Sequence, residues 1–111
     1  MHTRTTAIGV IPTYNCGRML PRLLPRVPHE VLDAIFVIDD DSSDDTVLVA
    51  QRLGLKTFSH PHRGYGGNMK YALEKALEAG AEYVVEIHGD GQYDPAVIPE
   101  ALARARSGAD F

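Results

Sequence analysis

The sequence predicts an α/β domain built around a parallel sheet. Short apolar runs alternate with amphipathic segments, and strongly polar loops follow three of the apolar runs. Parallel strands that are covered on both faces read as continuous apolar runs, and ligands bind beyond their carboxyl ends. With right-handed crossovers, the four expected strands take the order 3-2-1-4 in the sheet.

The first half of the chain predicts three strands and two helices. Residues 7–11 are continuously apolar, as expected of a strand buried on both faces. Residues 18–24 place leucine and methionine on one side and arginine on the other, and the prolines that follow end this short helix. Residues 34–38 form a second buried strand rich in β-branched residues. An aspartate cap then opens a helix that ends near residue 53, and residues 55–59 form a weaker strand.

The second half predicts two helices around a fourth strand. Residues 69–80 repeat apolar side chains at helical spacing and turn lysine and glutamate outward. Residues 83–87 are a fourth apolar strand, and residues 95–106 form a helix that begins at a proline and ends before a glycine.

The composition is that of an ordinary globular domain. The 111 residues are 44% apolar and 23% charged, which suits one domain with a buried core. The single cysteine, Cys16, excludes an internal disulfide framework and predicts a reducing, cytoplasmic location. No apolar run reaches the roughly 20 residues that cross a bilayer. The net charge of −4 and arginine groups without interleaved aromatics give no support to nucleic-acid binding.

Two other folds with a similar sheet are excluded by their loops. A dinucleotide fold needs Gly-x-Gly-x-x-Gly after its first strand, whereas residues 12–17 read Pro-Thr-Tyr-Asn-Cys-Gly. A receiver domain needs an aspartate at the end of its third strand, where residues 59–61 read Ser-His-Pro. The acidic loop after the second strand therefore needs another explanation.

That acidic loop begins with two aspartates that leave a buried strand directly. Five of the seven residues from 39 to 45 are aspartates. Turns and helix capping explain Asp44 or Asp45, but they explain the pair Asp39 and Asp40 poorly. The pair therefore indicates a functional site rather than loop chemistry alone.

A glycine-rich segment, residues 63–68, precedes the helix expected at 69–80. Its backbone amides either hold phosphate at a helix N-terminus, or its glycines form a tight turn that packs closely. We interpret its tyrosine, Tyr65, as a packing residue. His60 and His62, just before it, are interpreted as loop histidines.

Four motifs resemble those of a known family. Residues 11–15 (Ile-Pro-Thr-Tyr-Asn) resemble the opening signature of family 2 glycosyltransferases, and residues 37–46 resemble that family's Asp-Asp-Gly-Ser loop. Residues 63–68 are similar to its glycine segment. Residues 88–95 (His-Gly-Asp-Gly-Gln-Tyr-Asp-Pro) resemble the metal-binding loop of the polyprenyl-phosphate, dolichol-phosphate mannose synthase-like branch. The motifs occur in the family's order and span nearly the whole chain.

The resemblance implies a Rossmann-like GT-A fold that binds a nucleotide-diphosphate sugar, of the UDP or GDP type, with Mg²⁺ or Mn²⁺. Carried over by position, the substrate-binding residues are Pro12, Tyr14, Asn15, Asp39, Asp40 and Arg63. The metal-binding residues are Asp90, Gln92 and His88. In such a site the cation bridges carboxylate and diphosphate, and it stabilises charge on the departing nucleotide diphosphate.

The metal-binding loop departs from the family at one position. His88 stands where the family usually has the first aspartate of Asp-x-Asp. Its imidazole can ligate Mn²⁺, hydrogen-bond the diphosphate, or serve a structural role, and the sequence leaves these three open. Asp94 precedes Pro95 and suits a helix cap, so Asp90 is the expected metal ligand of this loop.

The resemblance also implies that residues 1–111 are the donor-binding half of a GT-A domain. Family members are roughly twice this length, with the catalytic base and acceptor segments in the second half, so no catalytic residue is assigned here. Membrane contact is then expected only through the rest of a parent protein, at a cytoplasmic membrane face, or through a lipid acceptor. The alternative is a non-catalytic nucleotide-sugar-binding or interaction module. Independently of the resemblance, the fourth strand would lie at a sheet edge, so we expect the isolated chain either to self-associate or to be marginally stable, and not to transfer sugar by itself.

Overall fold

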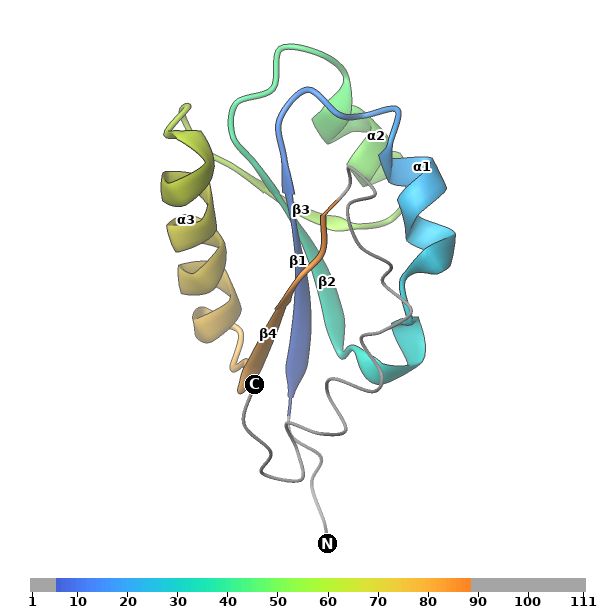
Figure 1. Cartoon of the computed structure of the whole chain (residues 1–111), viewed down its shortest axis with the longest axis vertical. Coiled ribbons are helices and arrows are strands. Elements are labelled where there is room, and N and C mark those ends of the chain that lie inside the picture. The colour runs from blue at the N-terminus through green and yellow to red at the C-terminus, as the bar shows by residue number, and fades with distance from the viewer. Residues whose placement is uncertain (1–5, 89–111) are drawn as a thin grey trace, which may run out of the picture.

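The computed structural model describes residues 6–88, which form a four-stranded parallel sheet between two helical layers (Figure 1). The strands are β1 (Ala7–Thr13), β2 (Ala34–Asp39), β3 (Lys56–Ser59) and β4 (Tyr83–Glu86). Their order is β3-β2-β1-β4, and all three neighbouring pairs are parallel. Both the predicted class and the predicted strand order are therefore confirmed.

The helices cover the sheet on both faces. On one face lie α1 (Leu20–Leu23) and α2 (Thr46–Arg52), and on the other lies α3 (Gly64–Glu78) (Figure 1). Two 3₁₀ turns, η1 (Leu24–Arg26) and η2 (His29–Val31), connect α1 to β2. The helix predicted at 95–106 lies outside the described residues.

Apolar side chains alternate between the two faces of each central strand. Ile8 and Val10 pack on the α3 side, whereas Ala7 and Ile11 pack on the side of α1 and α2. All four are at most 2% exposed, so β1 is buried on both faces, as its continuous apolar run predicted. Fully burying one such isoleucine contributes about 1.5–3 kcal/mol, which makes the two layers the main stabilising element of the domain.

The start of α3 differs from the prediction. The glycine-rich segment forms the first turns of α3, because the helix begins at Gly64 rather than near Met69. Gly64 has a φ of +77°, which glycine adopts without strain. A Cβ atom on Gly67 would lie 2.6 Å from the Cβ of Arg63, so glycine lets the preceding chain pack closely here. Of the two interpretations of the glycine-rich segment, phosphate binding or close packing, close packing is therefore the one that accounts for Gly67.

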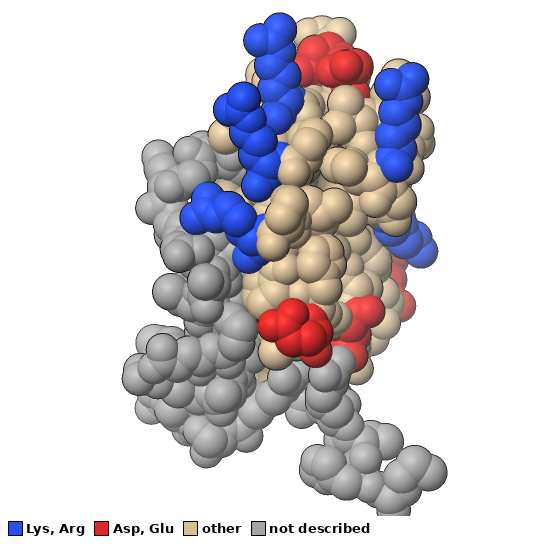
Figure 2. Space-filling view, turned by 90° about the vertical axis from the view of Figure 1, so that its right-hand side faces the viewer, with Lys and Arg blue, Asp and Glu red and all other residues tan. Residues whose placement is uncertain are grey.

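The basic residues near α1 form a solvated surface, as expected. Arg18, Arg22 and Arg26 are all exposed. Figure 2 looks at the α1 and α2 side and shows basic side chains along its flanks and acidic ones at its two ends. Within residues 6–88, no helix has the length and apolar character needed to span a membrane.

Candidate functional site

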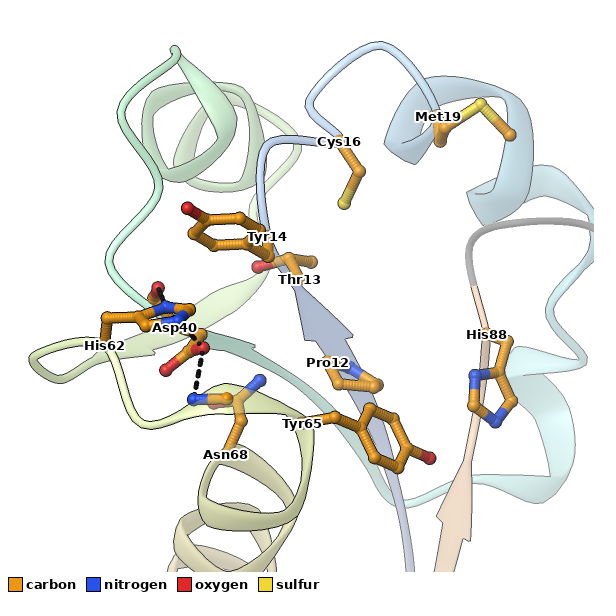
Figure 3. Close-up of a pocket in the computed structure, with 11 residues that line it drawn as sticks. Pro12, Thr13, Tyr14, Cys16, Met19, Asp40, His62, Tyr65, Asn68 and His88 are labelled. Atoms are coloured by element: carbon orange, nitrogen blue, oxygen red, sulfur yellow. Dashed lines mark hydrogen bonds and ion pairs between the residues drawn. The ribbon is translucent and has the colours of Figure 1, made fainter.

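A cavity of about 380 Å³ opens beside the carboxyl ends of the strands (Figure 3). This volume lies within the range of roughly 300–1,000 Å³ found for small-molecule sites. Its walls come from the ends of β1, β2 and β4 and from the start of α3. The lining residues are Pro12, Thr13, Tyr14, Cys16, Met19, Asp40, His62, Gly64, Tyr65, Asn68 and His88.

Asp39, the last residue of β2, is buried and braces two loops. Its Oδ1 accepts hydrogen bonds from the hydroxyls of Thr13 (2.7 Å) and Ser42 (2.6 Å), and its Oδ2 accepts one from the Ser42 amide (2.8 Å). Only 1% of the residue is exposed, and it does not line the cavity. Its carboxylate thus joins the end of β1 to the loop after β2.

Asp40 faces the other side and anchors the start of α3. Its two carboxylate oxygens accept hydrogen bonds from the backbone amides of Arg63 (2.7 Å) and Gly64 (3.0 Å). These amides belong to the first turn of the helix, where N–H groups lack intrahelical partners. The ring of His62 adds a third contact, 2.9 Å from Nδ1 to Oδ2. Asp40 is 3% exposed and lines the cavity.

Asn15, in the loop after β1, binds the acidic loop that follows β2. Its side-chain Oδ1 accepts hydrogen bonds from the backbone amides of Ser43 (2.8 Å) and Asp44 (3.3 Å), and its backbone amide donates to the Ser42 hydroxyl. Its φ of 50° is one that asparagine tolerates well. Asn15 therefore supports the cavity from behind and does not line it.

Arg63 is placed by its backbone. Its backbone amide donates to Asp40, and its guanidinium carbon lies 5.8 Å from the ring centre of Tyr71. The Arg63 side chain is not part of the cavity lining, and its position near the nucleotide stays a prediction.

Two buried polar residues, His60 and Asn68, lie next to Asp40, and His60 Nδ1 is 3.6 Å from Asp40 Oδ1. His60 Nε2 lies 2.6 Å from Asn68 Oδ1, and the Asn68 amide group donates to the carbonyl of Ile38 at 3.0 Å. The His60 ring also packs against Tyr71, with ring centres 4.6 Å apart. Asn68 is 3% exposed, so these bonds fix the register of α3 against β2.

An aromatic platform occupies one end of the cavity. The rings of Tyr14 and His62 lie 5.0 Å apart at an angle of 46°, directly above Asp40 (Figure 3). Tyr14 is 55% exposed, which leaves a face on which a planar group can stack. His62, interpreted from the sequence as a loop histidine, therefore belongs to the site.

A second polar group occupies the β4 end of the cavity. His88 Nε2 lies 3.0 Å from Oε1 of Glu86, and the Tyr65 hydroxyl donates to the same oxygen. The rings of Tyr65 and His88 are nearly parallel, with an interplanar angle of 16°. Tyr65 is 58% exposed, so its interpretation as a packing residue was wrong.

Two groups near the cavity have shifted pKa values. Burial raises the pKa of the Cys16 thiol, which keeps it protonated and suits a small packing residue. Hydrogen bonds from Thr46 lower the pKa of Asp44 and hold its carboxylate at the start of α2. Asp45 makes no side-chain capping bond, so of the two candidates Asp44 is the aspartate that binds the helix start.

The described part of the site does not by itself form a complete metal centre. Among residues 6–88, no group of three His, Cys, Asp or Glu side chains is arranged to hold a cation. Of the predicted metal ligands, His88 is at the cavity, and Asp90 and Gln92 lie outside the described residues. An imidazole whose other nitrogen faces a carboxylate fits a transition-metal ligand, and this is the arrangement of His88 and Glu86.

The cavity gathers four of the residues predicted from the sequence. These are Pro12, Tyr14, Asp40 and His88. Asn15, Asp39 and Arg63 lie behind or beside it, as described above. His62, Tyr65 and Asn68 were missed as cavity residues, although His62 lies in the loop after the third strand, which is itself a signal in a parallel sheet.

This parallel sheet of order 3-2-1-4, with a site at its carboxyl edge, matches the GT-A fold of the glycosyltransferases of similar structure. The model of the glycosyl transferase family 2 matches residues 10–111. The chain therefore belongs to glycosyl transferase family 2, and the resemblance seen in its motifs is confirmed.

Similar proteins place the chain within this family. An uncharacterized glycosyltransferase of Mycobacterium bovis is 33% identical over 102 residues, covering 92% of this chain and 44% of that protein. The polyprenol monophosphomannose synthase of Mycolicibacterium smegmatis is 31% identical over 110 residues, covering 92% of this chain and 42% of that protein. The chain thus spans less than half the length of these relatives.

The fold is also that of a solved glycosyltransferase. Glucosyl-3-phosphoglycerate synthase from Mycobacterium tuberculosis, in complex with Mn²⁺, UDP-glucose and phosphoglyceric acid, superposes with a TM-score of 0.74. The two are 25% identical, and the match covers 94% of this chain and 40% of that one.

Proposed function

We propose that this chain binds a nucleotide-diphosphate sugar together with a divalent cation, as the donor-binding half of a larger GT-A domain. The observation that carries the proposal is the division of the cavity into two ends. One end holds an aromatic platform beside a carboxylate, and the other holds an imidazole backed by a carboxylate.

The nucleotide is proposed to occupy the Tyr14 end. A base stacks on aromatic rings in many nucleotide sites, and Tyr14 and His62 offer such a surface. Asp40 lies beside it, and the His62 side chain that contacts its Oδ2 is 57% exposed. A base N–H group can therefore replace the His62 contact, which preserves the two backbone bonds that anchor α3.

The diphosphate and its cation are proposed to lie toward His88. Asp90 follows two residues later in the sequence, and a carboxylate with an imidazole is a donor set suited to Mn²⁺. A bound cation would stabilise the charge that develops on the departing nucleotide diphosphate. The Mn²⁺ and UDP-glucose bound by the synthase from Mycobacterium tuberculosis support this class of donor.

For the whole protein we propose sugar transfer to an acceptor such as a polyprenyl phosphate or a glycan. The similarity to a polyprenol monophosphomannose synthase supports the lipid acceptor. Donor turnover with a polyprenyl phosphate, measured on the whole protein, tests this. Donor binding without turnover on any acceptor would favour a non-catalytic nucleotide-sugar-binding module.

The proposal for this chain is tested by calorimetric titration with UDP and GDP in Mn²⁺, Mg²⁺ or EDTA. Binding is expected with one of the two nucleotides and in the presence of a cation. Because the pocket is acidic, EDTA should weaken that binding at least about tenfold. Equal affinity with and without EDTA would show that nucleotide binding does not require a cation and would contradict this part of the proposal.

A further inference from the structure

We propose that Glu86 is a positioning residue that fixes the tautomer and orientation of His88 at the cavity. This inference rests on the proposed function and deepens its metal and diphosphate end. It assigns a role to a carboxylate in the last residue of β4 that no motif identifies.

The strand geometry places the two side chains together. Residues two apart in an extended chain point to the same face, so Val84, Glu86 and His88 share one face of β4 and its continuation. Val84 packs in the apolar cluster beneath α3, which identifies this face as the α3 side. Glu86 and His88 are 31% and 30% exposed at their side chains, and the Nε2 to Oε1 distance is 3.0 Å.

Tyr65 holds the same carboxylate from a second element. Its hydroxyl donates to Oε1 of Glu86, the oxygen that faces His88. Its ring lies nearly parallel to that of His88, with ring centres 6.2 Å apart. Since Tyr65 belongs to the first turn of α3 and Glu86 to β4, the contact joins two walls of the cavity and limits where the carboxylate can point.

The chemistry of the pair determines which nitrogen carries the hydrogen. An ionised carboxylate accepts hydrogen bonds and cannot donate them, so Nε2 of His88 bears the hydrogen. A neutral ring then has its lone pair on Nδ1, the nitrogen able to ligate a cation. A carboxylate behind a histidine in this way also raises the basicity of the ligand nitrogen.

The charge of the pair explains how a histidine can stand where an aspartate is usual. A neutral imidazole bonded to a carboxylate carries one negative charge in total, as a single aspartate does. The atom offered to the cation is nitrogen rather than oxygen, however, and nitrogen ligands favour transition metals over Mg²⁺. The pair is therefore expected to shift the site toward Mn²⁺.

The test compares the 111-residue chain with Glu86→Gln, with Glu86→Asp, and with Glu74→Gln as the matched control. Glu74 is exposed on α3, and its substitution makes the same chemical change away from the cavity. Two-dimensional ¹⁵N NMR of the histidine rings, at a mildly alkaline pH where ordinary imidazoles are neutral, reports the tautomer without any ligand. Calorimetry with UDP and either Mn²⁺ or Mg²⁺ reports binding.

The expected result has two parts. In the unsubstituted chain His88 shows the Nε2–H tautomer, and Glu86→Gln shifts it toward a mixture because an amide group can donate to Nε2. The same substitution should weaken Mn²⁺-dependent UDP binding about tenfold or more and reduce the preference for Mn²⁺ over Mg²⁺. Glu86→Asp should retain part of the Nε2–H tautomer and part of the Mn²⁺-dependent UDP binding, and Glu74→Gln should retain both in full.

Two results overturn the inference. If Glu86→Gln behaves as Glu74→Gln in both measurements, Glu86 does not position His88. If the tautomer shifts but Mn²⁺-dependent UDP binding is unchanged, His88 does not act on the cation. An unsubstituted chain that binds no nucleotide with any cation would refute the proposed function, and the ligand-free nitrogen shifts would still decide whether Glu86 sets the tautomer.

Discussion

The buried aspartate at the end of β2 allows a quantitative test of how the site is held together. Asp39→Asn keeps the size of the side chain but turns one of its oxygens into a donor. Three donors surround Asp39 at 2.6–2.8 Å, so one of them must then face an amide N–H group. Losing one charged hydrogen bond costs about 1.5–3 kcal/mol. The other two become bonds to a neutral oxygen, roughly half as strong, which brings the expected loss to at least about 3 kcal/mol.

Urea unfolding followed by circular dichroism measures this loss directly. Asp41→Asn is the matched control, because Asp41 is exposed and its φ of 61° suits asparagine equally well. We expect the control to lie within about 0.5 kcal/mol of the original chain. Thr13→Val removes one of the three donors, so the double variant should be less destabilised than the sum of the two single variants. If Asp39→Asn unfolds like the control and yet loses nucleotide binding, Asp39 contacts the ligand and does not brace the loops.

Three further predictions test other parts of the site. Tyr14→Ala should weaken nucleotide binding about tenfold in calorimetry, since stacking on an aromatic ring contributes roughly 1–3 kcal/mol, whereas Tyr14→Phe should retain it. Asp44→Ala should lower the free energy of unfolding by about 1 kcal/mol at neutral pH. Because the pKa of Asp44 is lowered in the folded state, its contribution is present above the ordinary value of 3.8 and lost as the pH falls through the folded value, so the two proteins should unfold alike in strong acid. Asp90→Asn should abolish the cation dependence of binding and Asp94→Asn should leave it, and the opposite result in a Mn²⁺ titration would reassign the metal ligand.

The layered fold could be predicted because each buried strand is apolar on both faces. Val10 and Val37 are completely buried between the two layers, and such runs have few alternatives in a chain of this composition. The start of α3 could not be predicted in the same way. Its glycines disfavour a helix locally, but the carboxylate of Asp40 binds the amides of Arg63 and Gly64 and so stabilises the first turn. A contact between residues more than twenty positions apart thus determines a local boundary.

The site was predictable to the extent that residues after strands reach the same edge of the sheet. Tyr14, Asp40 and His88 met at the cavity for this reason. The adjacent aspartates separate because successive side chains of a strand point to opposite faces. Asp39 therefore turns away from the cavity and Asp40 toward it. The alternation of side chains along a strand predicts this difference, whereas the family resemblance assigns both aspartates to the ligand. Glu86 belongs to no motif, and the structure alone brings it to His88.

The two buried carboxylates hold together the loops around the cavity, which affects how any loss of nucleotide binding must be interpreted. Asp39 joins the loops after β1 and β2, and Asp40 joins β2 to the start of α3. A substitution at either position displaces a wall of the cavity, so lost binding would follow whether or not the carboxylate touches the ligand. Glu86 is different, because it is about a third exposed and a pair of this kind typically contributes no more than about 1 kcal/mol. If Glu86→Gln changes nucleotide binding but leaves the free energy of unfolding unchanged, the effect is on the chemistry of the site and not on the stability of the fold.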